Sequence, residues 1–243
     1  MELFLLVAGA ILGGFVNGMT GFGFALMASG LWLQILAPTL VVPLVVVSML
    51  ASNLQALPRV WHMIEARRTL PLALGGVLGV PLGVWLLPQI PIDQFKLAVV
   101  VLILLNFLFI SVLRNRLHLP ARYENASPLA GFLGGIFAGL NGLSGVVTTI
   151  WSGLFGWSKR EKRGVFQGYN LIMALTSLAF FYSRGYLNAE FFYYAVIVIP
   201  ISLISAFIGV RVFERLADLQ FTILINGLLL FSAFNLLLSV MMS

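Results

Sequence analysis

The sequence predicts an all-α, polytopic membrane protein built from two inverted repeats. Three observations lead to this fold class: a strongly apolar composition, a series of long apolar runs, and a glycine-rich interruption that occurs once in each half of the chain. Of the 243 residues, 60% are hydrophobic and 9% are charged, and the mean hydropathy is +1.05. Soluble domains carry roughly 25% charged residues, so the composition excludes a soluble protein.

Charged residues divide the chain into apolar runs, and a membrane-spanning helix needs about 20 apolar residues. The runs cover residues 3–36, 39–57, 69–87, 97–113, 128–157, 165–182, 191–210 and 221–242. Six of them suit a single crossing. The first and fifth are longer than one helix needs, and each has a polar, glycine-rich stretch near its middle. We therefore expect about eight apolar runs to give up to ten helical segments.

The basic residues indicate which loops face the cytoplasm, because lysine and arginine concentrate in short cytoplasmic loops. Twelve of the fourteen basic residues fall into four groups. These are Arg59, Arg67 and Arg68; Arg114, Arg116 and Arg122; Lys159, Arg160, Lys162 and Arg163; and Arg211 and Arg215. The sequence thus predicts four cytoplasmic sites and two external termini. The same placement explains the +6 charge by topology, without a nucleic-acid partner.

The fifth run lies between two predicted cytoplasmic groups, so it must cross the membrane an even number of times. We expect a hairpin that bends at residues 139–145, GLNGLSG. Two equal arms would have about 15 residues and rise roughly 22 Å, short of the roughly 30 Å hydrocarbon core. This predicts a re-entrant hairpin. The first run has a matching stretch at residues 17–24, NGMTGFGF, and should bend there in the same way.

Two segments recur at nearly the same offset, which indicates an internal duplication. Residues 12–23 align with 133–144 at an offset of 121, and residues 83–95 align with 209–221 at an offset of 126. We assign the repeats to residues 1–122 and 123–243. Each contains one broken hairpin and three crossings, an odd number, so the second repeat should be inverted. Inverted repeats with interrupted helices are typical of secondary transporters, whose substrate sites lie at the interruptions.

The two predicted breaks supply the groups that an anion site needs. A helix that restarts after a break presents free N–H groups and the positive end of its dipole. Thr20 and Ser144 are candidate caps for the returning arms, and glycine allows unusual backbone angles and a close approach of ligand. Close helix packing alone is the competing explanation for such small residues. The candidate substrate-binding residues at the breaks are Asn17, Thr20, Gly21, Gly23, Asn141, Gly142, Ser144 and Thr148.

Four amide side chains within spans extend this candidate site. Asn53 and Gln55 lie late in the second run, and Gln167 and Asn170 lie early in the sixth, which are the same crossing in the two predicted repeats. Since an unpaired amide is costly in lipid, these side chains should face a cavity or a neighbouring helix. Interhelical hydrogen bonding explains any one of them; as a set beside the hairpins, they favour a cavity lining.

The titratable residues argue against catalysis and against a proton relay. All eight carboxylates and both histidines fall in predicted loops or at span ends, and the chain has no cysteine. Without a nucleophile–base or metal-ligand pattern, we expect no enzyme activity, cofactor or metal. Proton-driven transporters usually carry an acid or a histidine inside the membrane. Coupling, if present, would therefore use backbone carbonyls or a proton carried by the anion; downhill export is the alternative.

The segments LGGFVNGMTGFGFAL (12–26) and GFLGGIFAGLNGLSG (131–145) resemble the TauE/SafE-type sulfite exporters. The resemblance covers essentially the full chain and implies a bacterial inner-membrane carrier of small sulfur-containing anions such as sulfite or organosulfonates. Its partners would be this anion and the lipid bilayer; the sequence leaves a homodimer open. A passive anion channel and a carrier for small carboxylates are the alternatives.

Overall fold

The computed structural model describes residues 2–21, 23–108, 119–213, 215, 227, 230–231, 233–234 and 236–238. These residues are helical or form turns and contain no strand. The helices are α1 Glu2–Thr20, α2 Phe24–Trp32, α3 Pro38–Val60, α4 Ala66–Leu86, α5 Ile92–Leu108, α6 Ser127–Asn141, α7 Ser144–Leu154, α8 Lys159–Ser183 and α9 Ala189–Phe213, with short 3-10 turns η1 Trp61–Met63, η2 Leu87–Gln89 and η4 Ala121–Ala126. The predicted last run, 221–242, lies largely outside the described residues.

Five of the described helices, α1, α3, α4, α8 and α9, are long and apolar enough to cross a membrane. Their outer faces fit a lipid environment. On α4, the exposed Leu70, Leu74 and Leu78 repeat every four residues and form one apolar stripe. The polar residues Asn17, Asn53 and Asn170 are instead buried between helices. The fold is that of a multi-pass helical membrane protein.

The first and fifth apolar runs each form a hairpin, as predicted. In the first hairpin (α1–α2), the indole Nε1 of Trp32 donates to the carbonyl oxygen of Leu6 at 3.0 Å. In the second (α6–α7), the indole Nε1 of Trp151 donates to Ser127 Oγ at 3.1 Å. Each bond joins the end of the returning arm to the beginning of the first arm, so the two arms are antiparallel.

The arms are unequal, which corrects the expectation of about 15 residues each. Helices α1 and α2 have 19 and 9 residues, and α6 and α7 have 15 and 11. Helix α1 alone rises about 28 Å, close to the thickness of the hydrocarbon core. The hairpins therefore combine a long first arm with a short return.

The two hairpins open toward opposite ends of α8. Ile35, just after the first hairpin, lines a surface pocket together with Gly185 and Glu190, which follow the end of α8. At the other end, the second hairpin is flanked by Glu124 and Trp157, whose side chains form a 2.9 Å hydrogen bond next to the first turn of α8. Because α8 has 25 residues, these ends are about 37 Å apart.

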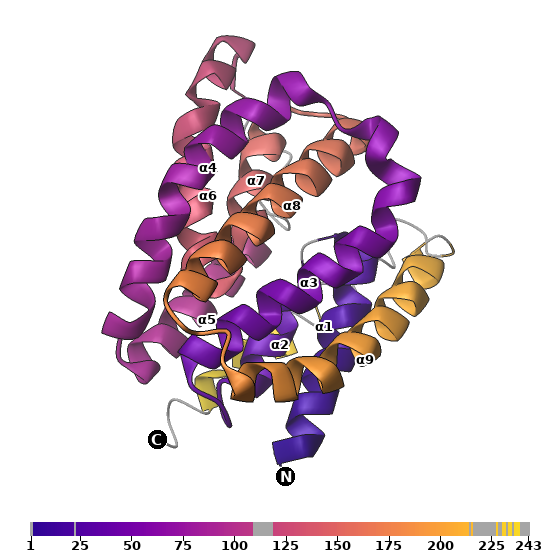
Figure 1. Ribbon diagram of the computed structural model, residues 1–243. Helices are drawn as coiled ribbons and strands as arrows, with labels where there is room; N and C mark the ends of the chain where they lie inside the picture. The colour runs from indigo at the N-terminus through magenta and orange to yellow at the C-terminus, as the bar shows by residue number, and fades with distance from the viewer. Residues whose placement is uncertain are drawn as a thin grey trace.

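Glycines let the hairpins pack closely against helices distant in sequence. Helix α4 lies along α6, and α9 lies along α1 (Figure 1). A Cβ atom at Gly79 would be 2.1 Å from the carbonyl oxygen of Phe132, and one at Gly18 would be 2.1 Å from that of Ala206. Only glycine allows backbones to approach this closely. The packing explanation for the glycines is thus correct along the arms, while the breaks require a separate account.

Candidate functional site

Each hairpin turns at a short break centred on a glycine with positive φ. The first break lies between the end of α1 at Thr20 and the start of α2 at Phe24, with Gly21 at φ +83°; the second covers 142–143, with Gly142 at φ +72°. The breaks are shorter than the predicted non-helical stretches 17–24 and 139–145, because α1 continues to Thr20, α6 continues to Asn141 and α7 begins at Ser144. This left-handed conformation costs about 1–2 kcal/mol for other residues, which explains the glycines.

Asn170, in the middle of α8, joins the two breaks. Its Nδ2 lies 3.4 Å from the carbonyl oxygen of Gly21 in the first break. Its Oδ1 accepts a 2.8 Å hydrogen bond from the hydroxyl of Ser144, which begins α7 just after the second break. Asn170 and Ser144 are fully buried. The structure therefore brings both breaks to one place, as the sequence predicted.

A second polar group lies between α1, α3 and α8. The Nδ2 of Asn17 lies 3.4 Å from Oδ1 of Asn53, and the Nε2 of Gln167 donates to the backbone carbonyl of Asn53 at 2.8 Å. Both asparagines are 2% exposed, yet Asn17 Oδ1 and Asn53 Nδ2 have no hydrogen-bond partner among the described residues. One end of each buried amide is therefore available to a ligand or to water.

The side chains of two other predicted residues, Thr20 and Asn141, form hydrogen bonds within the breaks themselves. Thr20 Oγ1 accepts a 3.0 Å hydrogen bond from the backbone N–H of Gly23 and donates to the carbonyl of Val16. Asn141 Oδ1 accepts a 3.0 Å hydrogen bond from the N–H of Leu143. These contacts shape the turns. Thr148 is buried and donates to the carbonyl of Gly145 within α7.

The predicted helix caps are wrong. Gly23 and Leu143 are the N-caps of α2 and α7, and neither provides a side-chain cap. Thr20 bonds Gly23 rather than a helical N–H, while Ser144 is the first residue of α7 and directs its hydroxyl to Asn170. The starts of the returning helices thus lack the side-chain caps that Ser or Thr usually provide.

Gln55 lies apart from the other predicted residues. It is exposed on α3, next to the exposed Leu54, whereas Asn53 points inward. The reason is helical geometry, because the side chains of residues two positions apart on a helix point in directions that differ by about 200°. Of the four amides predicted within spans, the structure brings Asn53, Gln167 and Asn170 to the breaks and leaves Gln55 on the surface.

Arg163, which the pattern of basic residues places in a cytoplasmic loop, lies at the first break. A Cβ atom at Gly21 would lie 2.9 Å from Nη1 of Arg163 and 3.5 Å from its Cζ. The guanidinium is therefore in contact distance of the break. Its spacing to Gln167 and Asn170, four and seven residues later, places all three on one face of α8. This spacing of four and seven residues is the signal in the sequence that could have identified Arg163. Grouping the basic residues by loop does not reveal it.

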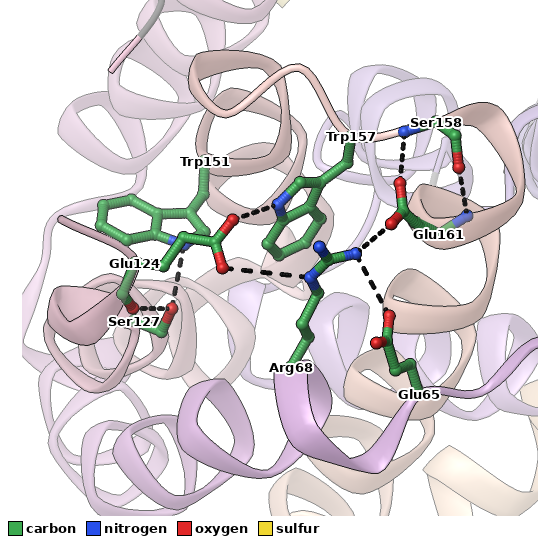
Figure 2. Close-up of polar contacts among 8 residues, drawn as sticks. All are labelled: Glu65, Arg68, Glu124, Ser127, Trp151, Trp157, Ser158 and Glu161. Carbon is green, nitrogen blue, oxygen red and sulfur yellow. Dashed lines mark hydrogen bonds and ion pairs between the residues drawn. The ribbon is translucent and has the colours of Figure 1, made fainter. Parts of the chain in front are cut away.

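A cluster of charges, which we call the Arg68 cluster, lies at the open end of the second hairpin (Figure 2). Arg68 contacts Glu161 and lies 3.2 Å from Glu65 and 4.0 Å from Glu124. Its guanidinium also lies 5.0 Å from the centre of the Trp157 ring. The cluster links three predicted cytoplasmic segments: the start of α4, η4 and the first turn of α8, where Ser158 and Glu161 form a capping box.

The described carboxylates lie at helix ends, away from the breaks. Glu2, Asp93, Glu161 and Glu190 are each in the first turn of a helix, and Glu65 and Glu124 lie just before α4 and within η4. The prediction for these six is confirmed; Glu214, Asp218 and His118 lie outside the described residues. Among the part of the chain that the structure describes, no group of His, Cys, Asp and Glu side chains could hold a metal ion.

Comparison with known proteins gives one match. The family described as "Sulfite exporter TauE/SafE" matches residues 5–236 of the chain. No curated protein and no solved structure gave a significant match. The family match covers both hairpins and the helices between them, so it spans both breaks.

Proposed function

Because the chain belongs to the sulfite exporter TauE/SafE family, we propose that it transports small sulfur-containing anions, such as sulfite or organosulfonates, across the bacterial inner membrane. Transport would proceed by alternating access around one anion site at the two helix breaks. The site would consist of the break backbones together with Asn17, Asn53, Ser144, Gln167 and Asn170. The protein would act as an exporter rather than as an enzyme, with both termini external.

One observation carries this proposal: a single side chain, that of Asn170, contacts both breaks. Broken helices inside a membrane leave backbone groups that lipid cannot satisfy, so they persist where protein or a cavity supplies partners. Here the partners are the side chains of Asn170, Thr20 and Asn141, and the nearby Asn17 and Asn53 each keep one amide atom unpaired among the described residues. The unpaired donor Asn53 Nδ2 and the uncapped helix starts favour an anion.

The packing of the hairpins supports an inverted-repeat mechanism. The first arm of each hairpin packs on a helix of the other half: α6 on α4, and α1 on α9. The hairpins also open toward opposite ends of α8. A rocking motion of one half against the other would then open the shared site to each side of the membrane in turn.

The proposal is tested by exchange in proteoliposomes that contain the purified full chain. We expect saturable uptake of radiolabelled sulfite that is accelerated by unlabelled sulfite inside the vesicles and inhibited by isethionate or sulfoacetate. Flux that does not saturate and lacks this acceleration would indicate a channel. Inhibition by acetate but not by the sulfonates would indicate a carboxylate carrier. Vesicles without protein provide the baseline.

A further inference from the structure

Arg163 lies against the first helix break. It is in the second turn of α8, and a Cβ atom at Gly21 would be 2.9 Å from its Nη1. Since Gly21 has no side chain, the guanidinium can lie directly against the break backbone. Arg163 is the charged member of the α8 face that also carries Gln167 and Asn170, which bond Asn53 and Gly21.

No carboxylate neutralises this guanidinium among the described residues. The nearest acid along the helix, Glu161, forms its ion pair with Arg68 and accepts a hydrogen bond from the backbone of Ser158. Residues 161 and 163 point in directions about 200° apart on a helix, so Glu161 faces the Arg68 cluster and Arg163 faces the first hairpin. Arg163 is partly buried, and a partly buried charge without a partner is costly.

The surroundings of Arg163 are suited to an anion. Asn53 Nδ2, a donor, is unpaired, and Asn53 is 2% exposed. Gln167 connects Asn53 to the helix face that carries Arg163. A guanidinium presents two parallel N–H groups that match two oxygens of an oxyanion, and it remains charged at all relevant pH values. A sulfite or sulfonate group has this oxygen arrangement.

We propose that Arg163 is the charged residue that binds the transported anion at the first break. This inference rests on the proposed function and adds the residue that selects for negative charge. The partial burial of Arg163 fits this role, because a bound anion would neutralise a charge that has no carboxylate partner among the described residues. The competing account is structural: Arg163 would hold the Gly21 turn in place without touching the substrate.

Binding and uptake by Arg163 variants separate these accounts. Arg67, exposed at the start of α4 and without a described ion pair, provides the matched control. We expect R163Q to weaken sulfite binding about tenfold or more. R163K should show an intermediate loss, because lysine keeps the positive charge but lacks the two parallel N–H groups of the guanidinium. R67Q should bind sulfite like the wild type. Unfolding temperatures without sulfite should change less than affinity. Unchanged affinity in a folded R163Q would overturn the proposal.

A chemical protection experiment covers the case in which R163Q does not fold. Phenylglyoxal modifies arginines, and mass spectrometry can compare Arg163 with Arg67 in the wild-type protein. Because sulfite adds to aldehydes, the protecting anion should be the sulfonate that competes best with sulfite for uptake. We expect it to slow modification of Arg163 but not of Arg67. Equal modification with and without the sulfonate would overturn the Arg163 assignment.

The failures of the two proposals are distinguishable. Wild-type vesicles that take up no more sulfite or sulfonate than empty vesicles would reject the proposed function, and the Arg163 assignment with it. Wild-type uptake that R163Q reproduces in full would reject the Arg163 assignment alone.

Discussion

The Nδ2 atom of Asn170 lies 3.4 Å from the carbonyl oxygen of Gly21, a residue 149 positions earlier in the chain. This contact crosses from the second half of the chain to the first at the point where α1 ends. The same side chain accepts a hydrogen bond from Ser144. A change in the relative position of the hairpins must therefore alter at least one bond of Asn170.

We expect Asn170→Leu to reduce sulfite affinity and to lower the free energy of unfolding by about 1–2 kcal/mol, because it removes both buried hydrogen bonds. Asn170→Asp keeps the acceptor for Ser144 but puts a negative charge beside the break, so it should impair anion binding more than stability. Thr176→Val is the control on the same helix, since Thr176 bonds only its own turn. Equal sulfite affinity in Asn170→Leu and Thr176→Val would contradict the prediction.

Replacing Gly21 tests whether the break has a role beyond backbone geometry. Gly21→Ala places a methyl group in a left-handed conformation and 2.9 Å from Arg163 Nη1. Gly185→Ala meets the same backbone strain, at φ +74°, with nothing within 4 Å. Both should lose about 1–2 kcal/mol of stability, measured by thermal or denaturant unfolding in detergent, but only Gly21→Ala should lower sulfite uptake. Normal uptake by both would assign Gly21 a purely conformational role.

The sequence predicted that the first and fifth runs break and that the two breaks form one site. It did not predict the lengths of the breaks or the position of Arg163 beside the first one. The length of the fifth run and the basic groups on both sides of it required this run to return to the same side of the membrane. The repeated glycine pattern gave the same prediction for the first run. The arm lengths could not be derived, since the glycine-rich stretch 17–24 does not mark the residues at which α1 ends and α2 begins. Arg163 was missed because the basic group 159–163 was counted as one loop, whereas α8 already begins at Lys159.

Close glycine packing between α4 and α6 should dominate stability. Gly79→Ala would place a Cβ atom 2.1 Å from the carbonyl oxygen of Phe132, and Gly135→Ala would place one 2.0 Å from that of Gly76. Either change must separate the two helices, and we expect it to lower the free energy of unfolding by about 1–3 kcal/mol or more. Gly227→Ala, a helical position with nothing within 4 Å, should be neutral or slightly stabilising. Unfolding in detergent measures all three; similar stabilities would contradict the packing account.

Neutralising single carboxylates should leave sulfite transport intact. Glu65→Gln, Glu124→Gln and Glu161→Gln each remove one ion pair of Arg68, and partly exposed pairs contribute at most about 1 kcal/mol. Arg68→Gln removes all three pairs and the contact with Trp157. This change should lower the free energy of unfolding more than any single glutamate change does, and the difference should shrink at high salt. Arg67→Gln should change the free energy of unfolding little. One acid-to-amide change that stops uptake while binding persists would place an acid in the transport mechanism.

Cysteine labelling tests the orientation of the second hairpin, and the chain has no native cysteine to interfere. Ala126 and Ser158 are exposed on either side of the α6–α7 hairpin, and the neighbouring Glu124 and Trp157 side chains bond at 2.9 Å. An impermeant maleimide should therefore label Ala126→Cys and Ser158→Cys from the same side of oriented vesicles. Gln34→Cys, exposed after the first hairpin, should react from the other side, because the first hairpin opens toward the opposite end of α8. Labelling of Ala126→Cys and Ser158→Cys from opposite sides would mean that the fifth run crosses the membrane once. In that case α6 and α7 could not return to one face, and the shared site at Asn170 would lose its second hairpin.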